Sequence, residues 1–289
     1  MKNLSLLLLL LMIILKSSAQ NLAGGDTILK FDQKFTKCER KWVAFRRSDT
    51  VKRIYYGFIY IDEQAGFTLD LKGTFYIDIS NKFIADTSLS ANKALKYRLK
   101  PNWPYFGLIP SKRFAELNLL AEPAWVKIYY QNTDTLQHLY RMGYVYNDAD
   151  ECGIALTYLK RAYVVNPHPP GVDFELAFAY NALKQYDDAI SVLLPAMLSK
   201  PGDPLYYKEL GYAYSHKNDY PNAIDTYKKG IEYFKGDEPN ESKGEMASNM
   251  ASIYKAMGKM DDYKFWMIKA KEYTPTTSYI YKQITDAGF

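Results

Sequence analysis

The pattern of small, apolar and polar positions changes character about halfway along this chain of 289 residues. From residue 136 to residue 277 it recurs every 34 residues. Five kinds of position keep this register: Gly143, Ala177 and Gly211; Tyr146, Tyr180 and Tyr214; Ala155, Ala189 and Ala223; Ala162, Ala196 and Gly230; Pro167 and Pro201. A period of this length is typical of stacked helix–turn–helix units. We therefore predict four units, at residues 136–169, 170–203, 204–237 and 244–277, with a polar insertion at 238–243.

The sizes of the repeated residues indicate how the two helices of a unit pack. The eighth position is small in every unit: Gly143, Ala177, Gly211 and Ala251. The twenty-fourth position is large: Leu159, Leu193, Tyr227 and Met267. Because packed helix axes lie only about 8–10 Å apart, we expect the large side chains to fill the space above the small ones. The tyrosines of the eleventh position are expected in the core: Tyr146, Tyr180, Tyr214 and Tyr254.

Residues 20–110 show the pattern of a small β domain. Runs rich in Val, Ile, Tyr and Phe, separated by turn residues, predict antiparallel strands at 41–47, 53–62, 67–72 and 74–80. A helical connector is predicted at 111–135, with helices at 111–120 and 123–130 and Ser111 as the N-cap of the first. The array then occupies residues 136–289 and ends in a capping helix at 278–287. There Tyr279, Ile280 and Ile284 would contact the last unit, and Lys282, Gln283 and Asp286 would face outward.

The first 19 residues have the features of a secretory signal peptide. Lys2 precedes an apolar run at residues 4–15, and Ser17, Ser18 and Ala19 supply the small residues of a cleavage site before Gln20. An uncleaved membrane helix is the alternative, but such a helix needs about 20 apolar residues. We expect an exported protein, periplasmic or secreted, with no transmembrane segment after cleavage.

The charge of the chain bears on its partners, and its two cysteines bear on whether it contains a disulfide. The chain has 37 basic and 32 acidic residues, and loss of Lys2 and Lys16 with the signal segment would leave 35 and 32. This balance predicts no nucleic-acid partner. Cys38 and Cys152 lie in different halves of the chain. Export would permit a disulfide between them, and two buried thiols are the alternative.

Candidate chemistry is sparse. The three histidines, His138, His168 and His216, fall at unrelated positions of their repeats, which argues against a shared metal site or catalytic base. The chain has no phosphate-binding glycine loop, nucleophile elbow or paired-histidine zinc motif. We therefore predict neither enzymatic activity nor a cofactor nor a metal.

With its period and small and aromatic positions, the second half of the chain resembles a tetratricopeptide repeat array. There are departures. The aromatic residue usual at the fourth position is kept only at Tyr207, and Lys235 replaces the proline expected in the third unit. Pro195 lies within the second helix of its unit and is expected to kink it. The resemblance implies an α+β protein, with a C-terminal α-solenoid of four helix pairs preceded by the small antiparallel β domain.

The resemblance also implies a binding surface. In such arrays the first helix of each unit lines a concave groove, largely through its fifth, ninth and twelfth positions. Carried over to this chain, these positions are Tyr140, Tyr144, Asn147, Phe174, Phe178, Asn181, Lys208, Tyr212 and Ser215. This implies an exported scaffold that binds a protein or peptide segment. Alternatively, the chain's own front domain or connector fills the groove.

A second hypothesis assigns binding to the β domain. Its aromatic residues could stack on an envelope glycan or another ligand, or they could form the core of the domain: Trp42, Tyr55, Tyr56, Phe58, Trp103 and Tyr105.

Overall fold

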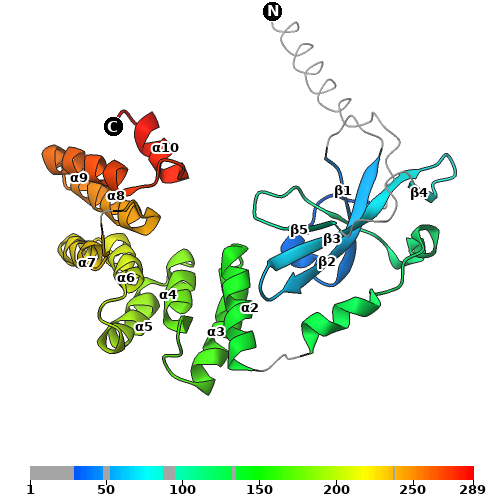
Figure 1. Ribbon diagram of the computed structural model, residues 1–289, viewed down its shortest axis with the longest axis horizontal. Coiled ribbons are helices and arrows are strands. Elements are labelled where there is room, and N and C mark those ends of the chain that lie inside the picture. The colour runs from blue at the N-terminus through cyan, green and yellow to red at the C-terminus, as the bar shows by residue number, and fades with distance from the viewer. Residues whose placement is uncertain (1–28, 48–52, 87–94, 132–134, 237) are drawn as a thin grey trace, which may run out of the picture. The chain divides into compact units, whose positions relative to one another are not determined.

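The chain folds into two compact units, Met1–Ile128 and Tyr129–Phe289, in a computed structural model (Figure 1). The structure describes residues 29–47, 53–86, 95–131, 135–236 and 238–289. The predicted signal segment at 1–19 lies outside the described residues. The fold class is α+β, as predicted: an antiparallel sheet is followed by a solenoid of helix pairs.

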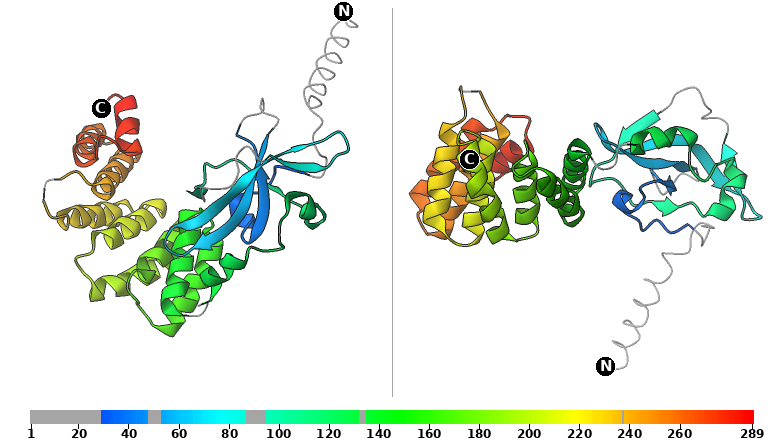
Figure 2. Two further views of the ribbon diagram at one scale, coloured as in Figure 1. Left: turned by 45° about the vertical axis from the view of Figure 1, so that its right-hand side comes forward. Right: turned by 90° about the horizontal axis from the view of Figure 1, so that it is seen from below.

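The first unit contains an antiparallel sheet. Its strands are β1 (Lys41–Phe45), β2 (Ile54–Asp62), β3 (Gly66–Ile77), β4 (Phe83–Asp86), β5 (Leu95–Arg98) and β6 (Gly107–Leu108). Their order is β4-β3-β2-β1-β6, and β5 pairs with the other part of β3. Figure 2 shows the sheet from two further directions. Because β3 is long, its outer edge pairs first with β5 and then with β4. Strands β4, β5 and β6 were not predicted from the sequence.

One predicted turn is wrong. The strands expected at 67–72 and 74–80 are a single strand, β3, which continues through Gly73. The sheet absorbs the irregularity as a bulge, because Tyr56 pairs with Gly73 and Gly57 pairs with Leu71, which leaves Lys72 as the extra residue. A Cβ atom on Gly57 would lie 2.4 Å from the backbone oxygen of Asp70, so this crossing requires glycine.

The segment after the sheet packs against it through short 3-10 helices. These are η3 (Ser111–Arg113), η4 (Ala115–Leu117) and η5 (Ala124–Tyr130), and a further one, η1 (Phe35–Lys37), precedes β1. The helices predicted at 111–120 and 123–130 are therefore shorter and tighter than expected. Ser111 is not the N-cap, since that position is Pro110. The indole of Trp42 donates a 2.8 Å hydrogen bond to the Leu120 carbonyl, which ties this segment to β1.

The second unit consists of four helix pairs and a final helix. The pairs are α2 (Leu136–Asp148) with α3 (Cys152–Val165), α4 (Val172–Ala182) with α5 (Tyr186–Ser199), α6 (Pro204–His216) with α7 (Tyr220–Glu232), and α8 (Glu241–Ala256) with α9 (Met260–Tyr273). The final helix is α10 (Tyr279–Asp286). Part of the polar insertion extends α8, because the Asn240 side chain accepts hydrogen bonds from the backbone amides of Ser242 and Lys243.

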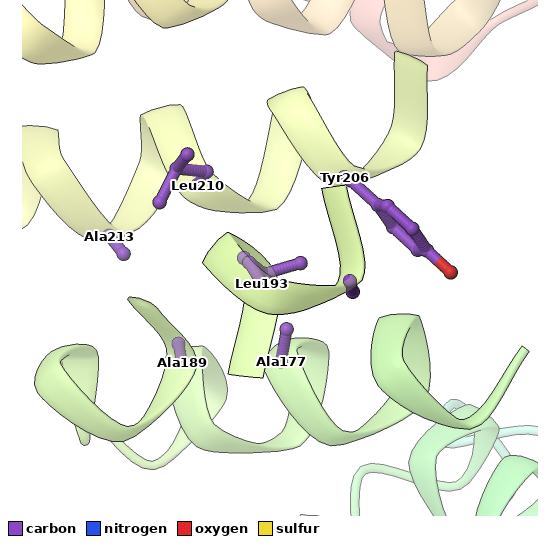
Figure 3. Close-up of a cluster of buried hydrophobic side chains, with 7 residues drawn as sticks. Ala177, Ala189, Leu193, Tyr206, Leu210 and Ala213 are labelled. Carbon is purple, nitrogen blue, oxygen red and sulfur yellow. The ribbon is translucent and has the colours of Figure 1, made fainter. Parts of the chain in front are cut away.

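Packing within each pair follows the predicted exchange of small and large residues. A Cβ atom on Gly143 would lie 2.3 Å from Leu159, and one on Gly211 would lie 2.6 Å from Tyr227. Successive units then share apolar clusters, one of which is drawn in Figure 3: Ala177, Ala189, Leu193, Ala196, Tyr206, Leu210 and Ala213. These contacts between neighbours supply most of the core of the array.

Several details of the array depart from the predictions. Helix α5 runs through Pro195 without interruption. In α10, Ile284 is buried and Ile280 packs on the last pair as predicted, whereas Tyr279 is 71% exposed and faces solvent. Tyr279 and Ile280 share the first turn of α10, and only Ile280 is on the side that faces the last unit. The tyrosines of the eleventh position belong to the core, with Tyr146 and Tyr254 buried and Tyr180 and Tyr214 packed against apolar clusters.

Candidate functional site in the repeat array

The aromatic residues of the ninth position lie on the first helices of three successive units. Tyr144 is on α2, Phe178 on α4 and Tyr212 on α6. Tyr144 is 37% exposed, and Phe178 and Tyr212 are half-buried. Because they are 34 residues apart, each of the first three units has one such ring at the same position. Of the nine predicted contact residues, Tyr144 alone is exposed.

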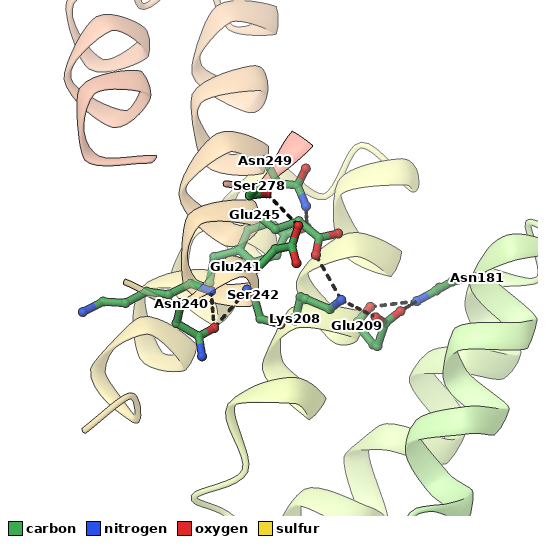
Figure 4. A network of polar contacts seen from close by, with 11 residues as sticks. Asn181, Lys208, Glu209, Asn240, Glu241, Ser242, Glu245, Asn249 and Ser278 are labelled. Carbon is green, nitrogen blue, oxygen red and sulfur yellow. Dashed lines mark hydrogen bonds and ion pairs between the residues drawn. The ribbon is translucent and has the colours of Figure 1, made fainter. Parts of the chain in front are cut away.

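The predicted contact residues of the fifth position make contacts within the array. Tyr140 and Phe174 are half-buried, and the hydroxyl of Tyr140 lies where a Cβ atom on Gly171 would approach to 2.8 Å. The Lys208 ammonium lies 3.4 Å from Glu209 Oε1 and 3.1 Å from Glu245 Oε2 (Figure 4). Lys208 forms ion pairs with both carboxylates, and the one with Glu245 connects α6 to α8 of the next unit.

The asparagines of the twelfth position connect neighbouring units. Asn147 Nδ2 donates to Glu175 Oε2 at 2.8 Å and to the Glu175 backbone oxygen at 3.0 Å. Asn181 repeats this arrangement one unit later, donating to Glu209 Oε2 and to its backbone oxygen, both at 3.0 Å. We call each such pair a rung. Both asparagines are 3% exposed, so they lie between helices and not on an open groove.

The two rungs differ in their electrostatic surroundings. Burial raises the pKa of Glu175 to about 7, because none of the described cations neutralises it and the Asn147 amide only partly offsets desolvation. Burial also raises the pKa of Glu209, against the opposing effects of Lys208 and Asn181. Glu209 therefore has a neighbouring ammonium that Glu175 lacks.

The third junction, between α6 and α8, has no rung. Ser215 is the residue of the third unit that corresponds to Asn181 of the second. Asn249 is the residue of the fourth unit that corresponds to Glu209 of the third, once the six inserted residues are counted. Both side chains are shorter than those of a rung. Asn249 Nδ2 instead donates to the Tyr227 hydroxyl at 3.2 Å. A pocket of about 420 Å³ lies here, bounded by α6, α7 and α8.

The pocket has polar and aromatic walls without charge. Its lining residues are Tyr212, Ser215, His216, Asn218, Tyr220, Tyr227, Asn249, Ser252, Ile253 and Ala256. Tyr212 and Ser215 were predicted as contact residues. The other lining residues were not, although the loss of the Asn–Glu pattern at Ser215 and Asn249 is visible in the sequence. The Tyr212 ring stacks on His216 with 4.0 Å between ring centroids.

His168 and Asp173 form a polar cluster with Tyr163 between the first and second units. Asp173 occupies the fourth position, where an aromatic residue is usual, and it is buried 3.0 Å from His168 Nδ1. The Tyr163 hydroxyl lies 3.3 Å from Nδ1 and 3.0 Å from Nε2 of the same imidazole. A hydroxyl nearly equidistant from both nitrogens is not in line with either one's lone pair, so the cluster lacks the geometry of a proton relay. It compensates locally for the burial of Asp173.

The aromatic residues proposed to stack on a glycan do not form an exposed row on the first unit. Trp42, Tyr56 and Phe58 are buried in the sheet. Tyr55 and Trp103 pack against Phe45, at 5.4 and 5.8 Å between ring centroids. Tyr105 is exposed. Trp42, Tyr56 and Phe58 are core residues, and the six together provide no exposed stacking face, so the hypothesis of such a face on these residues is wrong.

Cys38 and Cys152 are both free and buried, which fits the alternative of two buried thiols. Burial raises the pKa of the Cys38 thiol to about 11 and raises that of Cys152 as well. Both thiols are therefore protonated and unreactive near neutral pH. Among the residues that the structure describes, no three His, Cys, Asp or Glu side chains gather as ligands for a metal ion. No helix in those residues has the length and apolar character needed to cross a membrane.

Comparison with known proteins identifies the repeats. The tetratricopeptide repeat family matches residues 206–236, which span α6 and α7. With the 34-residue period and the observed helix pairs, this match shows that the second unit is a tetratricopeptide repeat array. The sequence matches none of the curated proteins with which it was compared.

Three solved structures illustrate the likeness. A tetratricopeptide repeat protein of Thermus thermophilus is 20% identical, with a TM-score of 0.47, and the match covers 56% of this chain and 85% of that one. MamA of Desulfovibrio magneticus RS-1 is 17% identical, with a TM-score of 0.43 and coverage of 50% and 78%. The Sgt2 repeat domain of Aspergillus fumigatus is 22% identical, with a TM-score of 0.39 and coverage of 44% and 81%. At these TM-scores, none of the three structures bears on the function of this chain.

Proposed function

We propose that the repeat array is a protein-interaction scaffold that binds a segment of a partner through the first helices of its units. The observation that carries this proposal is the row of rings at the ninth position, Tyr144, Phe178 and Tyr212, of which Tyr144 is exposed and the other two are half-buried. A tyrosine ring offers apolar area and a hydrogen-bonding hydroxyl at a small cost in side-chain entropy, and aromatic residues are enriched among the contacts that dominate binding energy.

The polar residues of the same helices limit what the row can recognise. Asn147 and Asn181 use their amide nitrogens in the rungs, and Lys208 is held by two carboxylates. These three residues could bind a charged ligand only if their contacts between units were broken. A partner segment would therefore be held by ring contacts and by hydrogen bonds to tyrosine hydroxyls, and an uncharged or mildly apolar segment fits best.

A pull-down from envelope extract tests the scaffold. The variant Tyr144→Ala/Phe178→Ala removes two rings of the row and leaves the pocket residues untouched. The matched control, Tyr279→Ala/Phe265→Ala, removes one tyrosine and one phenylalanine that are 71% and 52% exposed on α10 and α9. We expect the wild type and the control to retain the same partner and the row variant to lose it, with unchanged circular dichroism. Equal capture by all three proteins would contradict the proposal.

We also propose that the protein is exported. The support is the apolar run at residues 4–15 followed by Ser17, Ser18 and Ala19. Expression with a C-terminal tag, followed by N-terminal sequencing of the purified protein, should give a chain that begins at Gln20. Recovery of the intact chain from the cytoplasmic fraction would contradict export, and its recovery from the membrane fraction would indicate an uncleaved anchor.

A further inference from the structure

The pocket at the third junction lies where this junction lacks the rung side chains of the other two. A rung places a carboxylate and a carboxamide between adjacent first helices, and the two asparagines involved are 3% exposed. Ser215 and Asn249 occupy the same two positions with shorter side chains. Since Asn249 turns to the Tyr227 hydroxyl, the space between the helices stays open.

Hydrogen-bonding groups around the pocket are fixed by contacts at their other ends. His216 Nδ1 lies 3.0 Å from the Tyr212 carbonyl, which can only accept, so Nδ1 carries the proton and Nε2 of the neutral ring is an acceptor. The Ser252 hydroxyl donates to the Ser248 carbonyl at 3.1 Å and keeps its lone pairs for another donor. The Tyr227 hydroxyl accepts from Asn249, and the Tyr227 side chain is fully buried.

We propose that this pocket is a binding site for an uncharged saccharide. Sugar hydroxyls both donate and accept, which matches the Ser252 hydroxyl, the His216 imidazole and the carboxamides of Asn218 and Asn249 among the lining residues. The volume of about 420 Å³ lies within the range of about 300–1,000 Å³ typical of small-molecule sites. This site is on the repeats, and it shares Tyr212 with the ring row but neither Tyr144 nor Phe178.

The lining excludes the main alternatives. None of the ten lining residues is Lys, Arg, Asp or Glu, so the pocket has no counter-ion for a phosphate, a carboxylate or an ammonium group. A single carboxamide side chain of a peptide could meet the same polar groups, but it would leave most of the volume unfilled. A saccharide ring fills the space and satisfies several of these groups together.

Saturation-transfer NMR and calorimetry on the full chain test the proposal. The probes are the neutral disaccharides cellobiose, maltose and N,N′-diacetylchitobiose, with digalacturonate as the charged comparison and acetyl-glutamine amide as the carboxamide comparison. We expect at least one neutral disaccharide to bind, and digalacturonate and acetyl-glutamine amide to give no signal. Binding of acetyl-glutamine amide alone, or of none of the probes, would overturn the assignment of a saccharide.

Two pairs of variants locate the binding. Ser215→Asn/Asn249→Glu rebuilds a rung in the pocket and should weaken the disaccharide at least tenfold, whereas Ser191→Asn/Asn222→Glu makes the same changes at exposed positions and should not. If the first variant folds poorly, Ser252→Ala removes one lining hydroxyl from α8 and should weaken binding severalfold, with Ser191→Ala as its control. Unchanged affinity in both pocket variants would place the saccharide elsewhere. Because Tyr144 and Phe178 do not line the pocket, their double variant should bind the disaccharide normally, which separates this proposal from the scaffold.

Discussion

The first two junctions of the array differ from the third in the two side chains at the rung positions, and a pocket lies at the third junction. At the first two, an asparagine of one unit hydrogen-bonds a buried glutamate of the next. At the third, Ser215 and Asn249 stand at these positions, and a pocket remains. Each repeat contacts only its neighbours, so one junction can change without affecting the others. A regular array can therefore acquire a cavity at one chosen place.

The polar insertion makes this change structurally tolerable. Residues 238–240 are exposed, and Asn240 caps α8. Glu245, in the first turns of α8, then meets Lys208 of α6 (Figure 4). This ion pair connects α6 to α8 near one end of the junction. It replaces part of what the missing rung would supply.

The largest expected effect concerns the charge of the first rung. At pH 8, Glu175→Gln should raise the free energy of unfolding by about 2–3 kcal/mol, because a carboxyl whose pKa rises from 4.5 to about 7 is costly to hold ionised. The sign follows from linkage. The folded state binds this proton more tightly, so the contribution of Glu175 is fully present below pH 4.5 and is lost as the pH rises through about 7. Urea unfolding of wild type and variant between about pH 4.5 and 8 should show two curves that meet at the acid end.

Glu209→Gln is the matched comparison on the second rung. Lys208 lies 3.4 Å from Glu209, so neutralising this carboxylate also removes a partner of a nearly buried ammonium. We expect a smaller gain than for Glu175→Gln, or a net loss. An equal gain for both variants would mean that Lys208 does not distinguish the two rungs.

Removing the amide of the first rung should lower the free energy of unfolding, by slightly less than Glu175→Gln raises it. Asn147→Ser leaves the ionised Glu175 without its side-chain donor and should lower the free energy of unfolding at pH 8 by about 1–3 kcal/mol. At pH 5 the loss should shrink, because a protonated Glu175 can act as a donor itself. Asn181→Ser should cost less at pH 8, since Lys208 still contacts Glu209. A loss that does not change with pH would show that Asn147 acts through packing alone.

The repeats could be predicted from the sequence because their packing depends on residue size at fixed spacing. Gly143 opposite Leu159 and Gly211 opposite Tyr227 are contacts between helices of one unit, and the period alone places them together. The rungs could not be derived in the same way. The family pattern assigned Asn147 and Asn181 to the groove, but whether an amide faces solvent or a neighbouring carboxylate depends on the rotation of adjacent helices, which the period does not specify.

The sheet shows a similar limit. The pair Lys72 and Gly73 predicts a turn, because glycine is common where a chain reverses direction. In the folded chain it lies inside β3, where the crowding of Gly57 against the backbone of Asp70 produces a bulge. That contact links two strands and cannot be read from either strand alone. Strand β6 was missed for a related reason, since it has only the residues Gly107–Leu108 and gains its identity by pairing with β1.

The two helices of a unit pack closely both beside the junctions that have a rung and beside the third junction, which has none. A substitution that disturbs this packing should therefore cost about the same in either place. Gly143→Ala and Gly211→Ala each place a Cβ atom against a buried side chain, at 2.3 and 2.6 Å. Overpacking costs about 1–3 kcal/mol, and the better helix propensity of alanine returns up to about 1, so each variant should lose about 1 kcal/mol by urea unfolding. Gly153→Ala, with no atom within 4 Å, should gain stability instead. If Gly211→Ala alone were harmless, Tyr227 would have room to move into the pocket.

The smallest net change is expected when the open junction is converted into a closed one. Ser215→Asn/Asn249→Glu adds a hydrogen bond to a charged group, worth about 1.5–3 kcal/mol, but it buries a carboxylate and removes the bond from Asn249 to Tyr227. These terms nearly cancel, so the double variant should unfold within about 1 kcal/mol of the wild type. Asn249→Glu alone lacks the amide donor and should cost about 1–3 kcal/mol. The two single variants and the double variant form a cycle whose coupling free energy should be favourable by about 1 kcal/mol or more. A coupling of zero would mean that positions 215 and 249 do not meet as the rung positions do, and that the third junction differs from the others in backbone spacing as well as in side chains.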